Sequence, residues 1–211
     1  LKCKRSRSPS LRCIDRLQTF AAFACQCQNG CAMANLKNLP VGKKAPEIVH
    51  MVIEVPRGSS NKYEYDPDLE AIKLDRVLPT AQFYSGDYGF IPSTLAEDGD
   101  PLDGVILSTY PLLPGVVVDV RIVGMVDMQD EKGGDAKIIG VVAEDPRWDH
   151  ILDLNDVPTA FKQEIQNFFE TYKALEAHKG KWVKVSGWKD KASALAEVQA
   201  CIERFREVKD R

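Results

Sequence analysis

The chain has 211 residues, of which 44% are hydrophobic and 28% charged, and these are the proportions of one globular domain with a substantial core. Its net charge of −3 is uneven, because residues 1–32 contribute +5 and leave −8 for the remainder. The acidic body argues against a nucleic-acid-binding protein, which needs a surplus of Lys and Arg on one face, and no apolar run approaches the ~20 residues of a membrane-spanning helix.

Residues 1–45 show no sustained helical or strand periodicity, and we predict that they form a disordered extension to one domain over residues 46–211. The Arg- and Ser-containing start is typical of an organelle-targeting peptide; the alternative is upstream sequence outside the mature protein, with Met33 as its natural start. Five of the six cysteines fall in this extension, so the folded part does not rely on disulfides. That distribution suits a reducing compartment, and we expect a cytoplasmic protein.

The sequence becomes rich in β-forming residues from residue 48 onward. A strand is predicted at 49–55, followed by a hairpin of residues 62–65 and 71–74 around the turn-prone Asp66-Pro67-Asp68. Four further apolar segments are predicted strands: residues 105–107, 116–126, 137–142 and 182–185. Short strands at this spacing favour a closed barrel.

Two segments in the C-terminal third have helical periodicity. Apolar residues recur at helical spacing from Phe161 to Leu175, after Pro158, and again from Ala192 to Val208. We expect both helices to pack an apolar stripe onto the barrel. The predicted fold class is therefore mainly β with α.

The most informative stretch is Asp98-Gly99-Asp100-Pro101-Leu102-Asp103, which places three carboxylates within six residues. Carboxylates held this close repel one another unless a divalent cation lies between them, and Mg²⁺ prefers such an all-oxygen environment. The alternative is a solvated acidic turn. A calcium-binding EF-hand loop fits less well, because Asp103 stands where that loop requires glycine.

Two other groups of polar residues are ambiguous when read alone. Asp130-Glu131, Asp135 and Lys137 flank the Gly133-Gly134 turn between two predicted strands, where a merely hydrophilic hairpin is the alternative. Tyr172-Lys173 lies on the first predicted helix, where the tyrosine could equally be a core residue and the lysine its solvated neighbour.

Taken together, the order and types of these residues resemble the family I soluble inorganic pyrophosphatases. The resemblance covers about residues 47–208. It rests on the Asp-x-Asp-Pro-x-Asp signature at 98–103 and on the following matches: Glu54, Lys62-Tyr63-Glu64, Asp75-Arg76, Phe83-Tyr84, Asp87-Tyr88-Gly89-Phe90, Asp130-Glu131, Asp135, Lys137 and Tyr172-Lys173. It implies a distorted five-stranded β-barrel of OB-like character with two packed helices, and the short bacterial form of the family implies a homohexamer.

The same resemblance implies an inorganic diphosphatase that hydrolyses pyrophosphate to two phosphates with Mg²⁺. Asp100 would be the general base, with Tyr88 and Arg76 also in the catalytic centre. The metal ligands and the carboxylates that support them would be Asp98, Asp103, Asp135, Asp130, Glu54, Glu64 and Glu131. The substrate-binding residues would be Lys62, Arg76, Tyr84, Tyr88, Lys137, Tyr172 and Lys173.

Two other functions remain to be weighed against this one. A phosphatase for nucleotides needs a pocket for a base, and the sequence holds no motif for one. An OB-like nucleic-acid-binding module needs a basic groove with exposed aromatic residues, which a body with a charge of −8 does not favour. Pyrophosphate is therefore the expected partner, and neither nucleic acid nor membrane is expected.

Overall fold

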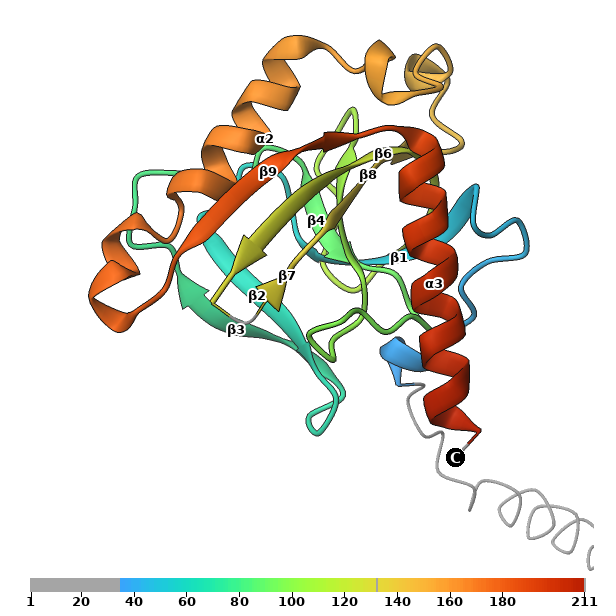
Figure 1. Cartoon of the computed structure of the whole chain (residues 1–211), viewed down its shortest axis with the longest axis horizontal. Coiled ribbons are helices and arrows are strands. Elements are labelled where there is room, and N and C mark those ends of the chain that lie inside the picture. Colours follow the sequence, from blue (N-terminus) through green and yellow to red (C-terminus); the bar gives the residue numbers. More distant parts are fainter. Residues whose placement is uncertain (1–34, 132, 211) are drawn as a thin grey trace, which may run out of the picture. The chain divides into compact units, whose positions relative to one another are not determined.

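A closed barrel of five strands is the centre of the computed structural model, which describes residues 35–131 and 133–210 (Figure 1). Around the barrel the strands follow one another in the order β1 (Ile48–Val55), β4 (Asp87–Phe90), β5 (Asp103–Leu107), β8 (Lys137–Val142) and β6 (Val117–Asp130). The barrel closes because β1 also pairs with β6. Neighbouring strands are antiparallel except β5 and β8, which run parallel.

Most residues of the barrel strands are buried on both faces, and two helices contribute to this burial. In β5, Val105 and Leu107 belong to one apolar cluster and the intervening Ile106 to another, as the period of two in a strand requires. Helix α2 (Thr159–Thr171) supplies apolar residues to the first cluster, and α3 (Lys191–Lys209) supplies them to the second. The predicted class, mainly β with two packed helices, is confirmed.

A separate hairpin and two additional strands complete the sheet structure. Strands β2 (Asn61–Asp66) and β3 (Ala71–Val77) pair only with each other, which confirms the predicted hairpin. Strands β7 (Gly133–Gly134) and β9 (Val183–Lys189) both pair with the long strand β6. Within the residues that the structure describes, the remaining elements are four 3-10 helices: η1 (Leu36–Asn38), η2 (Pro146–Trp148), η3 (Leu154–Asp156) and η4 (Ala174–Lys179).

Several predicted boundaries differ from the structure. Strand β6 runs on to Asp130 and β9 to Lys189, past their predicted ends. Helix α2 ends at Thr171, so Leu175, the last residue of the predicted apolar stripe, is exposed in η4. Strand β4 was not predicted, because four residues that include an aspartate and a glycine give no apolar pattern. No helix among the described residues is long and apolar enough to cross a membrane.

The folded domain begins before residue 46, its predicted boundary. Leu36 and Leu39 pack on the cluster that contains Val52 and Phe90, while Val41 packs on the cluster covered by α3. These residues are too widely spaced to give a periodic signal, so residues 35–45 were read as part of the extension. Residues 1–34 of the predicted extension lie outside the described residues.

Gly89 of β4 is the position where the barrel tolerates a side chain least. An added Cβ would lie 1.9 Å from the carbonyl oxygen of Val52 in β1, and backbone atoms cannot move aside without breaking the pairing of β1 with β4. We expect Gly89→Ala to lower the free energy of unfolding by more than about 3 kcal/mol, measured by urea denaturation. Gly134→Ala is the control, because its Cβ would meet only the flexible Glu97 side chain at 3.4 Å. Equal urea midpoints for the two variants would contradict this account.

Candidate active site

All the predicted site residues line one open cavity of about 300 Å³. They come from β1, the β2–β3 hairpin, β4 and the segment before it, the loop before β5, the first residue of β5, the end of β6, the turn between β6 and β8, the first residue of β8, and the segment just after α2. The residues that the structure gathers there are Glu54, Lys62, Glu64, Arg76, Tyr84, Tyr88, Asp98, Asp100, Asp103, Asp130, Glu131, Asp135, Lys137, Tyr172 and Lys173. The cavity therefore combines many carboxylates with several cationic side chains.

Lys137 is a buried cation that pairs with two carboxylates of this cavity. It is the first residue of β8, and Asp103 is the first residue of the parallel neighbour β5, so the two side chains lie at the same edge of the barrel. The Lys137 ammonium donates to Asp103 Oδ2 at 2.7 Å and to the Asp135 carboxylate. Burial alone lowers the pKa of Lys137, but these two carboxylates more than offset burial and raise it, so the lysine stays charged.

Tyr88 is held against the same carboxylate. Its hydroxyl donates to Asp103 from the adjacent strand β4. Burial raises the pKa of the Tyr88 hydroxyl well above its usual value, and the negative charge of Asp103 raises it further. Tyr88 therefore remains a hydrogen-bond donor throughout the neutral pH range. Tyr84 packs on Tyr88, and burial raises the pKa of Tyr84 in the same way.

Lys173, just beyond the end of α2, makes a second ion-pair group with the end of β6. Its ammonium lies 3.0 Å from Asp130 Oδ2 and 3.3 Å from Glu131 Oε2. The backbone N–H of Trp182 also donates to Glu131. Burial opposes ionisation of Glu131, but a backbone hydrogen bond and Lys173 lower its pKa below the usual value.

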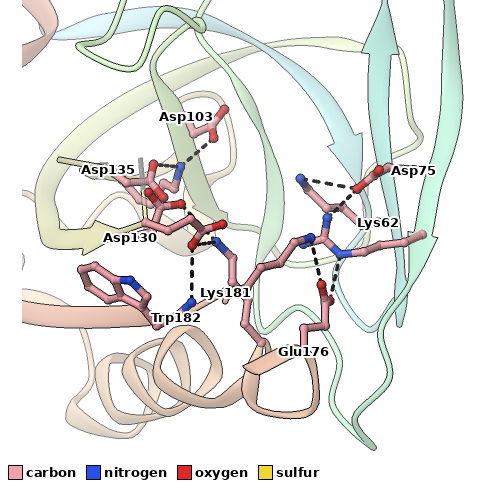
Figure 2. Close-up of polar contacts among 12 residues, drawn as sticks. Lys62, Asp75, Asp103, Asp130, Asp135, Glu176, Lys181 and Trp182 are labelled. Atoms are coloured by element: carbon pink, nitrogen blue, oxygen red, sulfur yellow. Dashed lines mark hydrogen bonds and ion pairs between the residues drawn. The ribbon is translucent and has the colours of Figure 1, made fainter. Parts of the chain in front are cut away.

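The hairpin carries a third group, separate from the first two in Figure 2. Lys62 of β2 contacts the Glu64 carboxylate and lies 3.7 Å from Asp75 Oδ2 of β3. The guanidinium of Arg76 donates to Asp75 at 2.7 Å. These two cations line the same cavity as the carboxylates of the barrel.

Glu54 of β1 is a buried carboxyl with little cationic compensation. Its Oε1 accepts a hydrogen bond of 2.7 Å from the backbone N–H of Tyr65. Burial raises the pKa of Glu54 to about 8, and the charges of Asp103 and Glu64 contribute in the same direction. A bound cation near Glu54 would remove this penalty and return the group to its ionised form.

The donor set fits a hard divalent cation, although the side chains do not already form a ligand cage. Carboxylate oxygens dominate the cavity, and Mg²⁺ prefers oxygen ligands. In the part of the chain that the structure describes, no three Asp, Glu, His or Cys side chains converge as a ready metal site. Instead Lys137 and Lys173 contact four of the carboxylates. The metal-binding roles of these carboxylates stay predictions.

Sequence reasoning missed four residues at or beside the cavity. Lys37 of η1 reaches within 3.6 Å of Asp100 Oδ1, from a segment that was read as disordered. Asp75 was part of the recognised pattern but received no role, and it pairs with both cations of the hairpin. Lys181 lines the cavity, and its partner Glu176 is buried behind the rim. Nothing in their local sequence distinguishes the last two from an ordinary polar loop.

Comparison with known proteins identifies the family. A sequence model described as inorganic pyrophosphatase matches residues 51–206. The inorganic pyrophosphatase of Thermus thermophilus is 79% identical over 174 residues, which cover 82% of this chain and 99% of that protein. The inorganic pyrophosphatase of Saccharolobus solfataricus is 49% identical over 168 residues, which cover 79% of this chain and 96% of that protein.

A solved structure agrees with these sequence matches. The crystal structure of inorganic pyrophosphatase from Thermus thermophilus superposes with a TM-score of 0.81 at 79% identity, and covers 82% of this chain and 99% of that one. The likeness confirms the predicted OB-like barrel. The chain therefore belongs to the family I inorganic pyrophosphatases, and the prediction that it is an enzyme of this hydrolase family is confirmed.

Proposed function

We propose that the chain hydrolyses pyrophosphate to two phosphates in the cavity described above. The observation that carries the proposal is the facing arrangement of cations and carboxylates around one cavity. Lys62, Arg76, Lys137 and Lys173 supply positive charge for phosphate oxygens, which Arg can contact in a bidentate manner. The carboxylates of the same cavity repel a polyanion, so the binding of pyrophosphate there requires a divalent cation.

Mg²⁺ is the cation that we propose for this site, held by the carboxylate oxygens of the barrel edge and the signature loop. Its proposed ligands are Asp98, Asp103, Asp130 and Asp135, with Glu54, Glu64 and Glu131 in support. When bound, Mg²⁺ neutralises phosphate oxygens and lowers the pKa of water. Ionised Glu54 would then accept hydrogen bonds rather than donate them, which suits a supporting role.

The protein's own side chains then orient the substrate and accept the proton. The ammonium and guanidinium groups hold the phosphate oxygens, and the hydroxyls of Tyr88, Tyr84 and Tyr172 remain neutral donors, because burial raises the pKa of all three. A carboxylate oxygen of Asp100 takes the proton of the attacking water. Asp100 suits that task because its side chain is exposed in the loop, with only Lys37 at ion-pair distance among the described residues.

We further propose a homohexamer in the cytoplasm. The resemblance to the short bacterial forms of the family supports the hexamer, and the single cysteine of residues 46–211 supports a reducing compartment. Light scattering coupled to size-exclusion chromatography measures the mass directly, and a monomeric mass would contradict the hexamer.

The sharpest test of the proposed function compares substrates. With Mg²⁺ present, phosphate release from pyrophosphate is expected to exceed release from ATP by at least about 10²-fold in kcat/KM, because most of the residues that line the cavity are charged and suit phosphate oxygens rather than a base. Equal rates on the two substrates would favour the nucleotide phosphatase instead. Tight binding of single-stranded DNA without hydrolysis of either substrate would favour the nucleic-acid-binding module.

A further inference from the structure

One buried carboxylate outside the predicted site connects two cations of the cavity. Glu176 lies in η4, and its side chain is 5% exposed. Its Oε1 lies 3.2 Å from Nε of Arg76, and its Oε2 lies 2.9 Å from the ammonium of Lys181. Both Arg76 and Lys181 line the cavity, whereas Glu176 is not among its lining residues.

The contact joins parts of the chain that are far apart in sequence. Arg76 belongs to the β2–β3 hairpin, which pairs with no barrel strand, while Glu176 follows the helix that packs on β9. The hairpin is attached to β1 through Tyr65, whose backbone N–H donates to Glu54, and the Glu176 ion pair adds a second attachment at Arg76. Arg76 Nε and Glu176 Oε1 are both shielded from solvent and form an ion pair without hydrogen-bond alignment. The attraction is thus little screened by water.

The two ends of the Arg76 guanidinium have different partners. One terminal nitrogen, Nη1, donates to Asp75 on the same strand, and Nε faces Glu176. Burial raises the pKa of Glu176, but the Lys181 hydrogen bond and the charge of Arg76 lower it below its usual value, so the carboxylate is ionised. Because Nη1 and Nε are oriented by these two carboxylates, the second terminal nitrogen, Nη2, can turn toward the cavity.

We propose that Glu176 is a positioning residue, which fixes Arg76 and Lys181 at the rim of the cavity so that both cations face phosphate oxygens. The inference rests on the proposed hydrolysis of pyrophosphate. Glu176 does not contact substrate itself; it acts through the two cations. A guanidinium held in one orientation loses less conformational entropy when it binds phosphate, so the effect falls on binding.

The test replaces Glu176 with Gln, which keeps the shape and removes the charge. We expect KM for pyrophosphate and the inhibition constant of inorganic phosphate to rise together by about tenfold, the scale of one charge-assisted hydrogen bond, with a smaller change in kcat. Glu164→Gln is the matched control, because Glu164 lies exposed on α2 and both constants should stay at their wild-type values. Glu176→Asp keeps the charge on a shorter side chain and should recover part of the loss.

A double-mutant cycle separates positioning from general support of the fold. If Glu176 acts in part through Arg76, then Glu176→Gln should raise KM less in an Arg76→Gln background than in the wild type, and the remaining effect acts through Lys181. Full additivity of the two changes would overturn the proposal, and so would a wild-type KM in Glu176→Gln. If Glu176→Gln does not fold, Glu176→Asp replaces it in the same cycle with the same two outcomes. A wild-type protein without pyrophosphatase activity would instead refute the proposed function.

Discussion

Exhaustive removal of divalent cations is expected to abolish hydrolysis of pyrophosphate, with a loss above about 10³-fold in kcat/KM. Removing one preorganised electrostatic partner of a transition state already costs about 10²–10³-fold, and the carboxylates of this cavity add repulsion toward the substrate when no cation is bound. Dialysis against EDTA followed by phosphate-release assays measures the effect. Added Mg²⁺ should restore activity, and Ca²⁺ should not, because it is larger and less demanding of octahedral geometry.

Thermal unfolding followed by circular dichroism provides the control for this experiment. The chelated protein should keep its secondary structure, because the barrel closes through β1 and β6 and its apolar clusters do not include the cavity carboxylates. Activity that persists after chelation, or Ca²⁺ that restores it as well as Mg²⁺, would contradict the proposed use of the carboxylates. The ion pairs of Lys137 with Asp103 and of Lys173 with Asp130 would then persist in the active enzyme, with no metal ion bound to these carboxylates.

The elements that could be predicted are those with a strong local pattern. Strand β1 and both helices follow from their apolar patterns, since each buries apolar residues of its own. The β2–β3 hairpin follows from its turn residues. Strand β4 and the segment before residue 46 could not be read in this way. Their few apolar residues find partners only in the assembled barrel.

The site shows the same division between local and distant information. The acidic signature and the matching motifs name residues that the structure does bring to one cavity. How they meet could not be read from the sequence, because the parallel pairing of β5 with β8 is a long-range choice that places Lys137 beside Asp103. Glu176 could not be predicted for the same reason, because its role depends on Arg76, a residue of the separate β2–β3 sheet that lies far away in the sequence.

Asp100→Asn is expected to lower kcat by about 10²–10⁴-fold, the usual range for loss of a general base. Asparagine keeps the shape of the side chain and one carbonyl oxygen, and the loop is held by groups that the change leaves intact, such as the hydrogen bond from the Asp100 backbone N–H to Asp98 Oδ1. Binding of substrate and metal should therefore change much less than kcat. Steady-state kinetics at several Mg²⁺ concentrations measure both quantities.

Asp98→Asn is the comparison variant, which distinguishes the loss of a metal ligand from the loss of a proton acceptor. Asp98 lies two residues away in the same exposed loop, and its proposed role is to bind the metal rather than to accept a proton. Its loss of activity should therefore be recovered in part by excess Mg²⁺, whereas that of Asp100→Asn should not, because added metal cannot replace a missing proton acceptor. If Asp100→Asn keeps near wild-type kcat, or recovers it when Mg²⁺ is raised, then Asp100 is a metal ligand or a structural residue. The base would then have to be another carboxylate of the cavity.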